Sequence, residues 1–310
     1  MSAPADSESW YDRMKTYVDC IPCFFKQALE AARIAGADEY MQREIMNDVA
    51  RTIPSFSMDA SPPVMARTIY SLVRERTQIE DPYLDIKNKS NHMALGLAEQ
   101  IRKKLDASAD RLLTAVELAI AGNIIDFGAK NRLNVHEELE KLMAREEQTL
   151  HGEAAQFFQY EVFQNVLQHS KTILYLADNA GEVFFDRVLL EEIKRIDAGK
   201  EILYAVKEKP AINDAMTKDA VDCGVNRVAR IISSGSDAPG TLLSGCPASF
   251  RSVFEQADMV ISKGQGNYET LSGTGRRIFF LLLAKCPVIA DNIGCRIGDV
   301  LLVTENGRQT

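Results

Sequence analysis

The order of apolar and polar residues changes character near residue 170. Before that point, apolar residues recur at helical spacing, and prolines at positions 54, 62, 63 and 82 separate the segments. Helices are predicted over residues 23–35, 41–52, 63–76, 112–127, 137–148 and 153–168. The pattern therefore predicts a helical N-terminal part over residues 1–170.

After residue 170, short apolar runs alternate with amphipathic segments. Strands are predicted over residues 172–177, 201–206, 230–233 and 259–262, and further apolar runs follow at 278–284, 287–290 and 300–303. Helices are predicted between them, over residues 183–196 and 213–223. Repeats of strand and helix favour an α/β fold with a mainly parallel sheet, here over residues 171–310.

Composition and charge narrow the class of protein. The 310 residues are 46% hydrophobic and 26% charged, which excludes a mainly disordered chain and a small disulfide scaffold. The net charge of -8 works against binding along a nucleic-acid backbone, so no nucleic-acid partner is expected. Residues 1–15 contain no apolar core of signal-peptide length, and the longest apolar run, 278–284, is far too short for a membrane span. The prediction is therefore a cytoplasmic protein without a membrane partner.

The first motif with chemical meaning spans residues 178–182, directly after a predicted strand. Asp178 and Asn179 carry oxygen atoms of the kind that Mg²⁺ or Mn²⁺ prefers. Gly181 permits a tight turn, and the helix that follows favours an anion at its N-terminus. The alternative is a simple turn in which Asp178 or Asn179 caps that helix.

The second motif follows the next strand. Lys207, Lys209, Asn213 and Asp214 come after its carboxyl end. If the two strands are neighbours, Asp214 lies beside Asp178 and the two carboxylates form an oxygen-rich cation site. The alternative is again a helix start, with Asn213 as the cap.

The third motif is the segment Ser-Lys-Gly-Gln-Gly-Asn-Tyr-Glu, residues 262–269. A glycine-rich loop can approach a phosphate closely, and Lys263 supplies a point charge. The segment is not a P-loop, which needs Gly-x-x-x-x-Gly-Lys-Ser/Thr. It is not a dinucleotide fingerprint either, because Glu269 stands at the third glycine position. A plain glycine-rich loop is the alternative, but all three motifs follow strand ends, where ligands of such sheets bind.

Two further features allow more than one interpretation. Asn123 and Asp126 interrupt an apolar helix, and they either reach the same crevice or mark an exposed stripe. Cys20 and Cys23 have the spacing of metal ligands, but one such pair is half a tetrahedral site, which Cys286 and Cys295 together would complete. A redox pair and buried thiols are the alternatives for the cysteines.

Taken together, four motifs resemble a known family. They are Asp-Asn-Ala-Gly-Glu, Lys-x-x-Pro-x-x-Asn-Asp, the segment 262–269, and Ala-Lys-Cys-Pro-Val-Ile-Ala. In this order they resemble the family once named domain of unknown function 89, whose members are similar to metal-dependent damage-control phosphatases. The resemblance covers residues 19–303, and the Cys-x-x-Cys pair makes the chain most similar to the archaeal and bacterial branch.

The resemblance implies an α/β fold with a Rossmann-like, mainly parallel sheet and a helical N-terminal part. It implies a divalent metal ion, Mn, Mg, Co or Ni, bound through Asp178, Asn179 and Asp214. Cys20, Cys23 and Cys286 stay candidates for a second metal site or a redox site. The residues implied in substrate binding are Glu182, Lys263, Gln265, Gly266, Asn267, Tyr268, Glu269 and, with a less defined role, Asn123.

The resulting hypothesis is hydrolysis of small phosphorylated metabolites at one divalent metal ion. Asp178 or Asp214 would also orient the attacking water, and Lys263, expected on a surface loop, would offset charge during transfer without contributing to stability. The alternatives are a metabolite-binding or sensor protein without catalysis, and a protein carboxyl methyltransferase. The Gly-Gln-Gly stretch departs from the Asp-Leu-Asn pattern of the sugar-phosphate branch.

Overall fold

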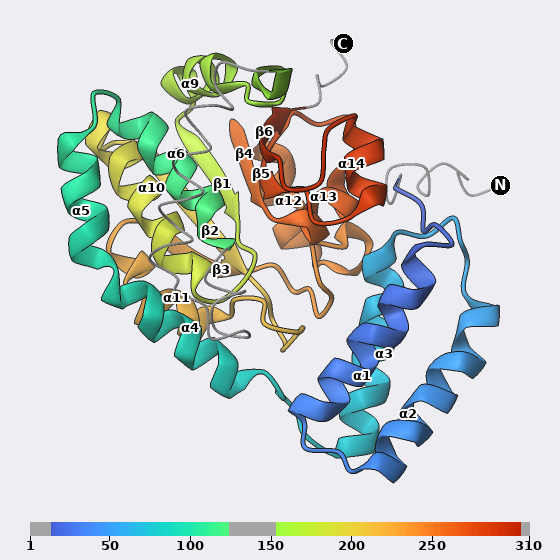
Figure 1. The fold of residues 1–310 in the computed structure, drawn as a ribbon. Coiled ribbons are helices and arrows are strands. Elements are labelled where there is room, and N and C mark those ends of the chain that lie inside the picture. The colour runs from blue at the N-terminus through green and yellow to red at the C-terminus, as the bar shows by residue number, and fades with distance from the viewer. Residues whose placement is uncertain (1–13, 124–152, 305–310) are drawn as a thin grey trace, which may run out of the picture.

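A six-stranded sheet forms the centre of the molecule in the computed structural model, which describes residues 14–123 and 153–304 (Figure 1). The strand order is β3-β2-β1-β4-β5-β6. Neighbours are parallel except β6, which runs antiparallel to β5. The predicted α/β class with a mainly parallel sheet is confirmed. The strands are β1 (Thr172–Leu176), β2 (Glu201–Val206), β3 (Arg230–Ser233), β4 (Met259–Lys263), β5 (Ile278–Leu283) and β6 (Val300–Thr304).

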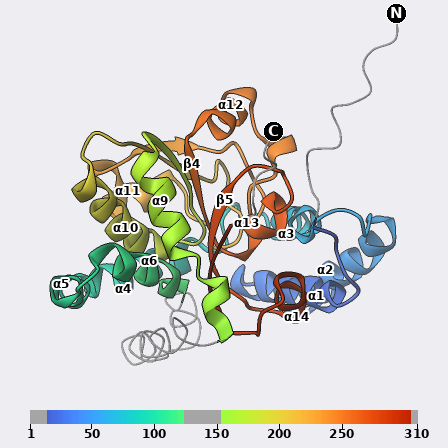
Figure 2. The same ribbon diagram turned by 90° about the horizontal axis from the view of Figure 1, so that it is seen from above.

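Helices cover both faces of the sheet, which is why the central strands are apolar along their whole length. In β1, Ile173 and Tyr175 join the core on one face, whereas Leu174 and Leu176 join the core on the other. Figure 2 separates the two layers. On the first face lie α6 (Arg111–Ala121), α9 (Tyr160–His169), α10 (Glu182–Ile196) and α11 (Thr217–Asp222), and on the second lie α12 (Ala248–Gln256), α13 (Gln265–Leu271) and α14 (Pro287–Ile293).

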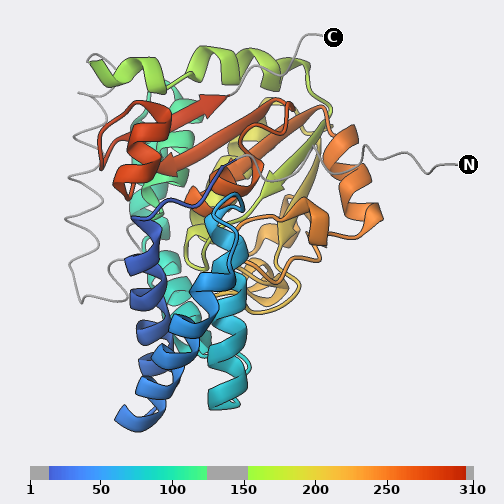
Figure 3. The same ribbon diagram turned by 90° about the vertical axis from the view of Figure 1, so that its right-hand side faces the viewer.

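The first three helices form a bundle with a core of its own, and it projects beyond one end of the strands (Figure 3). They are α1 (Cys20–Ile34), α2 (Glu39–Thr52) and α3 (Pro62–Thr77). The chain then returns through α4 (Leu84–Gly96) and α5 (Ala98–Ala107) to the first face of the sheet. In the described ranges, no helix is both long and apolar enough to cross a membrane.

Several predicted boundaries differ from the structure for identifiable reasons. The helix predicted over 213–223 begins only at Thr217, because Asp214 and Met216 form backbone bridges to Asn179 and Lys207. The segment 153–168 divides into a short 3₁₀ turn and α9, since Phe158 forms a bridge with Leu302. The predicted helix 137–148 and the end of 112–127 lie outside the described residues. The apolar run 287–290 lies in a helix, and α4, α5, α12 and α13 escaped the sequence pattern.

Candidate functional site

The strand order reverses between β1 and β4, and the candidate site lies just beyond this switch point. Asp178 follows β1, and Asp214 follows the neighbouring strand β2. An antiparallel bridge joins Asn179 to Asp214. The amide of Ala215 donates to the carbonyl of Asp178 at 2.8 Å, and the amide of Ala180 donates to the carbonyl before Asp214, also at 2.8 Å. These backbone bonds bring the first two predicted motifs together, as the sequence analysis expected for neighbouring strands.

Gly264 closes the site from the other side of the switch point. A Cβ atom on this residue would lie 1.9 Å from Oδ2 of Asp178, and its φ of +81° is a conformation that side chains disfavour. Only glycine therefore allows the end of β4 to pack directly against the Asp178 carboxylate.

A fully buried charged cluster lies beneath Asp178. Lys263 Nζ donates to Oε2 of Glu182 at 2.8 Å and to Oδ1 of Asp186 at 3.2 Å. The hydroxyls of Tyr175 and Tyr204 donate to the two oxygens of Asp186 at 2.6 and 2.7 Å. A buried ion pair is tolerated when hydrogen bonds satisfy its remaining atoms, and here two tyrosines do so.

This cluster corrects the prediction for Lys263. The residue is the last of β4 rather than part of a surface loop, and its side chain is completely buried. Lys263 does not line the cavity described below, so the geometry gives no support to direct contact with a substrate. The expectation that Lys263 contributes nothing to stability therefore loses its premise, because the side chain pairs with two buried carboxylates.

The Glu182 carboxylate also fixes the side-chain amide of Asn179. Nδ2 of Asn179 donates to Oε1 of Glu182 at 2.8 Å and to Oδ2 of Asp178 at 3.0 Å. Since both hydrogens of the amide face carboxylates, Oδ1 is the end left for the cavity that Asn179 lines. Glu182 itself lies behind the cavity wall, fully buried. Its predicted contact with substrate finds no support here, and its contacts are those of a positioning residue.

Negative charge accumulates at this point. Burial, together with the charges of Glu182 and Asp214, raises the pKa of Asp178 well above its ordinary value. Burial raises the pKa of Asp214 to about 6, although the ammonium of Lys207 opposes that shift. Oδ2 of Asp214 lies 3.4 Å from Nζ of Lys207 but accepts no hydrogen bond. A cation bound between these oxygens would relieve the repulsion, so the donor set fits a hard divalent ion.

A cavity of about 330 Å³ opens above these carboxylates, between the sheet and the helical bundle. Asp178, Asn179 and Asp214 line it from the sheet, whereas Gln27 and Tyr70 are among the residues that line it from α1 and α3. Among its described lining residues, Lys285 is the only lysine or arginine. Its charge lowers the pKa of Asp178, so its ammonium lies within electrostatic reach of that carboxylate.

Lys285 had no role assigned from the sequence. The only available signal was its position after the strand 278–283, inside the fourth family motif. The exposed, flexible side chain can reach an anion in the cavity, whereas Lys207 and Lys263 are both buried against carboxylates.

Residues 265–269, expected as a glycine-rich loop, begin the helix α13. Gln265, Gly266 and Glu269 line the cavity because these positions share one helix face, and Gln265 Nε2 donates to Glu269 Oε1 at 2.8 Å. Asn267 and Tyr268 face away. Asn267 Nδ2 donates to a backbone carbonyl at the end of β1, and Tyr268 packs in the core, so neither supports the predicted substrate contact.

The remaining candidates are placed as follows. Asn123 is buried at the end of α6, does not line the cavity, and its amide has no partner among the described residues.

Cys20, Cys23 and Cys286 all line the cavity. Within the described ranges, however, no three His, Cys, Asp or Glu side chains are arranged to hold a metal ion. Burial raises the pKa of Cys20 and Cys286, which disfavours the thiolate form. Asp126 lies outside the described residues.

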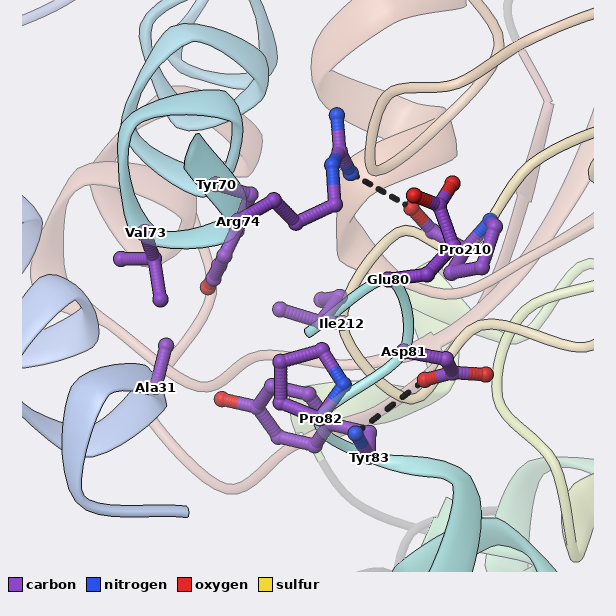
Figure 4. A pocket seen from close by; sticks show the side chains of 10 residues that line it. All are labelled: Ala31, Tyr70, Val73, Arg74, Glu80, Asp81, Pro82, Tyr83, Pro210 and Ile212. Carbon is purple, nitrogen blue, oxygen red and sulfur yellow. Dashed lines mark hydrogen bonds between the residues drawn. The ribbon is translucent and has the colours of Figure 1, made fainter. Parts of the chain in front are cut away.

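The bundle also holds the loop that carries Asp214 (Figure 4). Nη1 of Arg74, on α3, donates to the carbonyl of Pro210 at 2.9 Å, and Ile212 packs against the bundle core. Ile212 has a φ of +42°, an uncommon conformation for a β-branched residue. Such strain persists only where surrounding contacts fix it, so the bundle helps to determine the position of Asp214.

Comparisons with known proteins agree on one family. Residues 16–301 match the damage-control phosphatase ARMT1-like domain. The chain is 34% identical to a damage-control phosphatase of Pyrococcus horikoshii, covering 89% of this chain and 93% of that one, and 31% identical to a damage-control phosphatase of Archaeoglobus fulgidus, covering 93% and 98%. The crystal structure of a DUF89 family protein from Pyrococcus horikoshii matches with a TM-score of 0.83 and 31% identity, covering 94% of this chain and 99% of that one.

The buried cluster leads to a prediction for Lys263. Lys263→Met leaves Glu182 and Asp186 buried without a cation, so the free energy of unfolding should fall by roughly 3–5 kcal/mol. Chemical denaturation of the purified protein measures this change. Lys103→Met, which removes an exposed partner of Glu99, is the matched control and should leave the midpoint nearly unchanged. A wild-type midpoint for Lys263→Met would contradict the assigned role.

Proposed function

The chain belongs to the damage-control phosphatase ARMT1-like domain family, and from this premise we propose that its cavity hydrolyses phosphomonoesters of small metabolites at a divalent cation held by Asp178, Asn179 and Asp214. The convergence of these three side chains in the lining of the cavity carries the proposal. The cytoplasmic location predicted from the sequence is part of the same proposal.

The cation site is supported by three properties of the residues themselves. Oδ2 of Asp214 is buried without a hydrogen bond, and Oδ1 of Asn179 is the free end of a fixed amide. Burial, with the charges of Glu182 and Asp214 nearby, raises the pKa of Asp178. Oxygen donors of this kind suit Mn²⁺, Mg²⁺, Co²⁺ and Ni²⁺ without distinguishing between them. When bound, such a cation neutralises phosphate oxygens and orients water for in-line attack.

The chain's own residues supply binding and orientation. The ammonium of Lys285 pairs with a phosphate oxygen, because it is the cation that lines the cavity next to Asp178. The carboxylate of Asp178 or Asp214 accepts a hydrogen bond from the attacking water. Lys263, Glu182 and Asp186 act from below the cavity by keeping the Asn179 amide in one orientation. The helical bundle forms one wall of the cavity, through residues of α1 and α3.

Removal of a carboxylate ligand tests the site. We expect Asp178→Ala and Asp214→Ala each to abolish hydrolysis in a panel of phosphomonoesters assayed with and without Mn²⁺, Mg²⁺, Co²⁺ and Ni²⁺. The wild type should also gain thermal stability on addition of Mn²⁺, since a ligand that binds only the folded state stabilises it. Both variants should lose that gain.

The matched control is a carboxylate that does cap a helix. Oδ1 of Asp38 accepts the amide hydrogen of Met41 at 2.8 Å, on the exposed start of α2. Asp38→Ala should cost about 1 kcal/mol of stability and keep the full response to Mn²⁺. If Asp178→Ala and Asp214→Ala behave like Asp38→Ala, the cation site is refuted. A wild type that hydrolyses no ester with any of the four metals refutes the proposed reaction.

Glu182→Gln tests the orientation of the amide. Its side chain cannot offer an oxygen both to Lys263 and to Nδ2 of Asn179, so the Asn179 amide should lose its fixed orientation. The affinity for Mn²⁺, measured by calorimetry, should fall roughly 10–100-fold, as for other residues that support metal ligands. Glu192→Gln changes a buried carboxylate of the same helix that pairs with Arg111 instead, and it should keep wild-type affinity. Equal affinities in both variants would contradict the positioning role.

A further inference from the structure

We propose that the cavity admits phosphomonoesters whose alcohol part is neutral or cationic and excludes those that carry a second anionic group. This inference rests on the proposed phosphatase function and names the chemical class of its substrate. It concerns the part of the cavity away from Asp178 and Asp214, where α1, α3 and α13 form the wall.

The charged side chains of that wall are carboxylates. Asp19, at the start of α1, and Glu30, near its end, both line the cavity. Glu269 lines it from α13, but burial raises the pKa of Glu269 to about 7, so this carboxyl carries only part of a charge near neutral pH. Asp19 makes no side-chain cap bond to its helix. Lys285 is the only lysine or arginine among the described lining residues, and it already acts on Asp178. A second anion on the substrate would therefore meet like charges, and the described lining offers it no lysine or arginine besides Lys285.

Tyr70 lines the cavity together with Glu30 and Asp214. Its hydroxyl donates to Oε1 of Gln27 at 3.4 Å, on the same helix as Glu30. A substrate whose phosphate binds near Asp214 therefore extends into a cavity that Glu30 also lines.

The rest of the wall suits an uncharged group. Phe24, Pro62 and Ala66 contribute apolar surface, and Gln27 contributes an amide whose oxygen lies 3.4 Å from the Tyr70 hydroxyl. An alkyl chain can pack on the first three, and a hydroxyl group can bond to Gln27. Asp214 gives independent support for a ligand in this cavity. The residue is only 1% exposed, and its Oδ2 is left without a hydrogen bond.

Three synthetic esters of matched length test the inference. They are 5-hydroxypentyl, 5-aminopentyl and 4-carboxybutyl phosphate, which differ only in the charge of the group at the far end. With Mn²⁺ present, kcat/KM for the carboxylate ester should be at least about tenfold below that of the alcohol, whereas the amine should equal or exceed the alcohol. Thermal stabilisation by each ester gives the same order through binding alone, without turnover.

Substitution of the α1 carboxylates tests whether they cause the difference in kcat/KM between the esters. Asp19→Asn combined with Glu30→Gln should reduce the difference between the alcohol and carboxylate esters at least about threefold. Glu39→Gln combined with Glu161→Gln removes the same charge from exposed positions outside the cavity and should leave the difference unchanged. If the double variant does not fold, Asp19→Asn alone, at an exposed residue without a cap bond, should shift the ratio in the same direction.

The outcomes separate this inference from the phosphatase function. Binding in the expected order without hydrolysis refutes the reaction but retains the selection. Equal hydrolysis or equal stabilisation by the three esters overturns the selection and leaves the phosphatase function intact. Failure of all three esters to bind, or an unchanged ratio in the folded double variant, also overturns the selection.

Discussion

The ion pairs of Lys263 with Glu182 and Asp186 are the contacts on which the site depends. They lie where β1, β2, β4 and α10 meet, and every member of the cluster is buried. Charges in such a place are stable only as a complete set, because each one left alone would carry a large desolvation cost. One consequence reaches the cavity, since Glu182 determines which end of the Asn179 amide faces it. The charged cluster therefore links the packing of the sheet to the chemistry at its edge.

Part of this arrangement could be predicted from the sequence, for physical reasons. Buried parallel strands are continuous apolar runs, so β1, β2 and β4 were recognisable. Because their carboxyl ends share one edge, residues after β1 and β2 were expected to meet, and Asp178 and Asp214 do. The strand predicted over residues 259–262 ends one residue before Lys263, so Lys263 was expected in a loop, whereas β4 includes it. Met259 and Ile261 belong to the core on the α10 side, and strand alternation puts Lys263 on that same face once β4 includes it.

Other parts depend on contacts between segments far apart in the chain. Glycines at 264 and 266 suggested a loop, but Gly264 precedes a helix and its missing side chain serves the close approach to Asp178. The cavity itself needs the bundle, whose helices contribute Gln27 and Tyr70 from more than a hundred residues upstream of Asp178. Lys285 becomes a candidate for phosphate binding only when the cavity shows it to be the cation on the wall. No periodicity in the sequence contains that information.

Anomalous diffraction from crystals grown with Mn²⁺ tests the central claim most directly. We expect one strong anomalous peak in the cavity, in contact with oxygen atoms of Asp178, Asn179 and Asp214. A peak between Cys20, Cys23 and Cys286 instead, or a crystal saturated with Mn²⁺ that shows no peak beside Asp214, would contradict it.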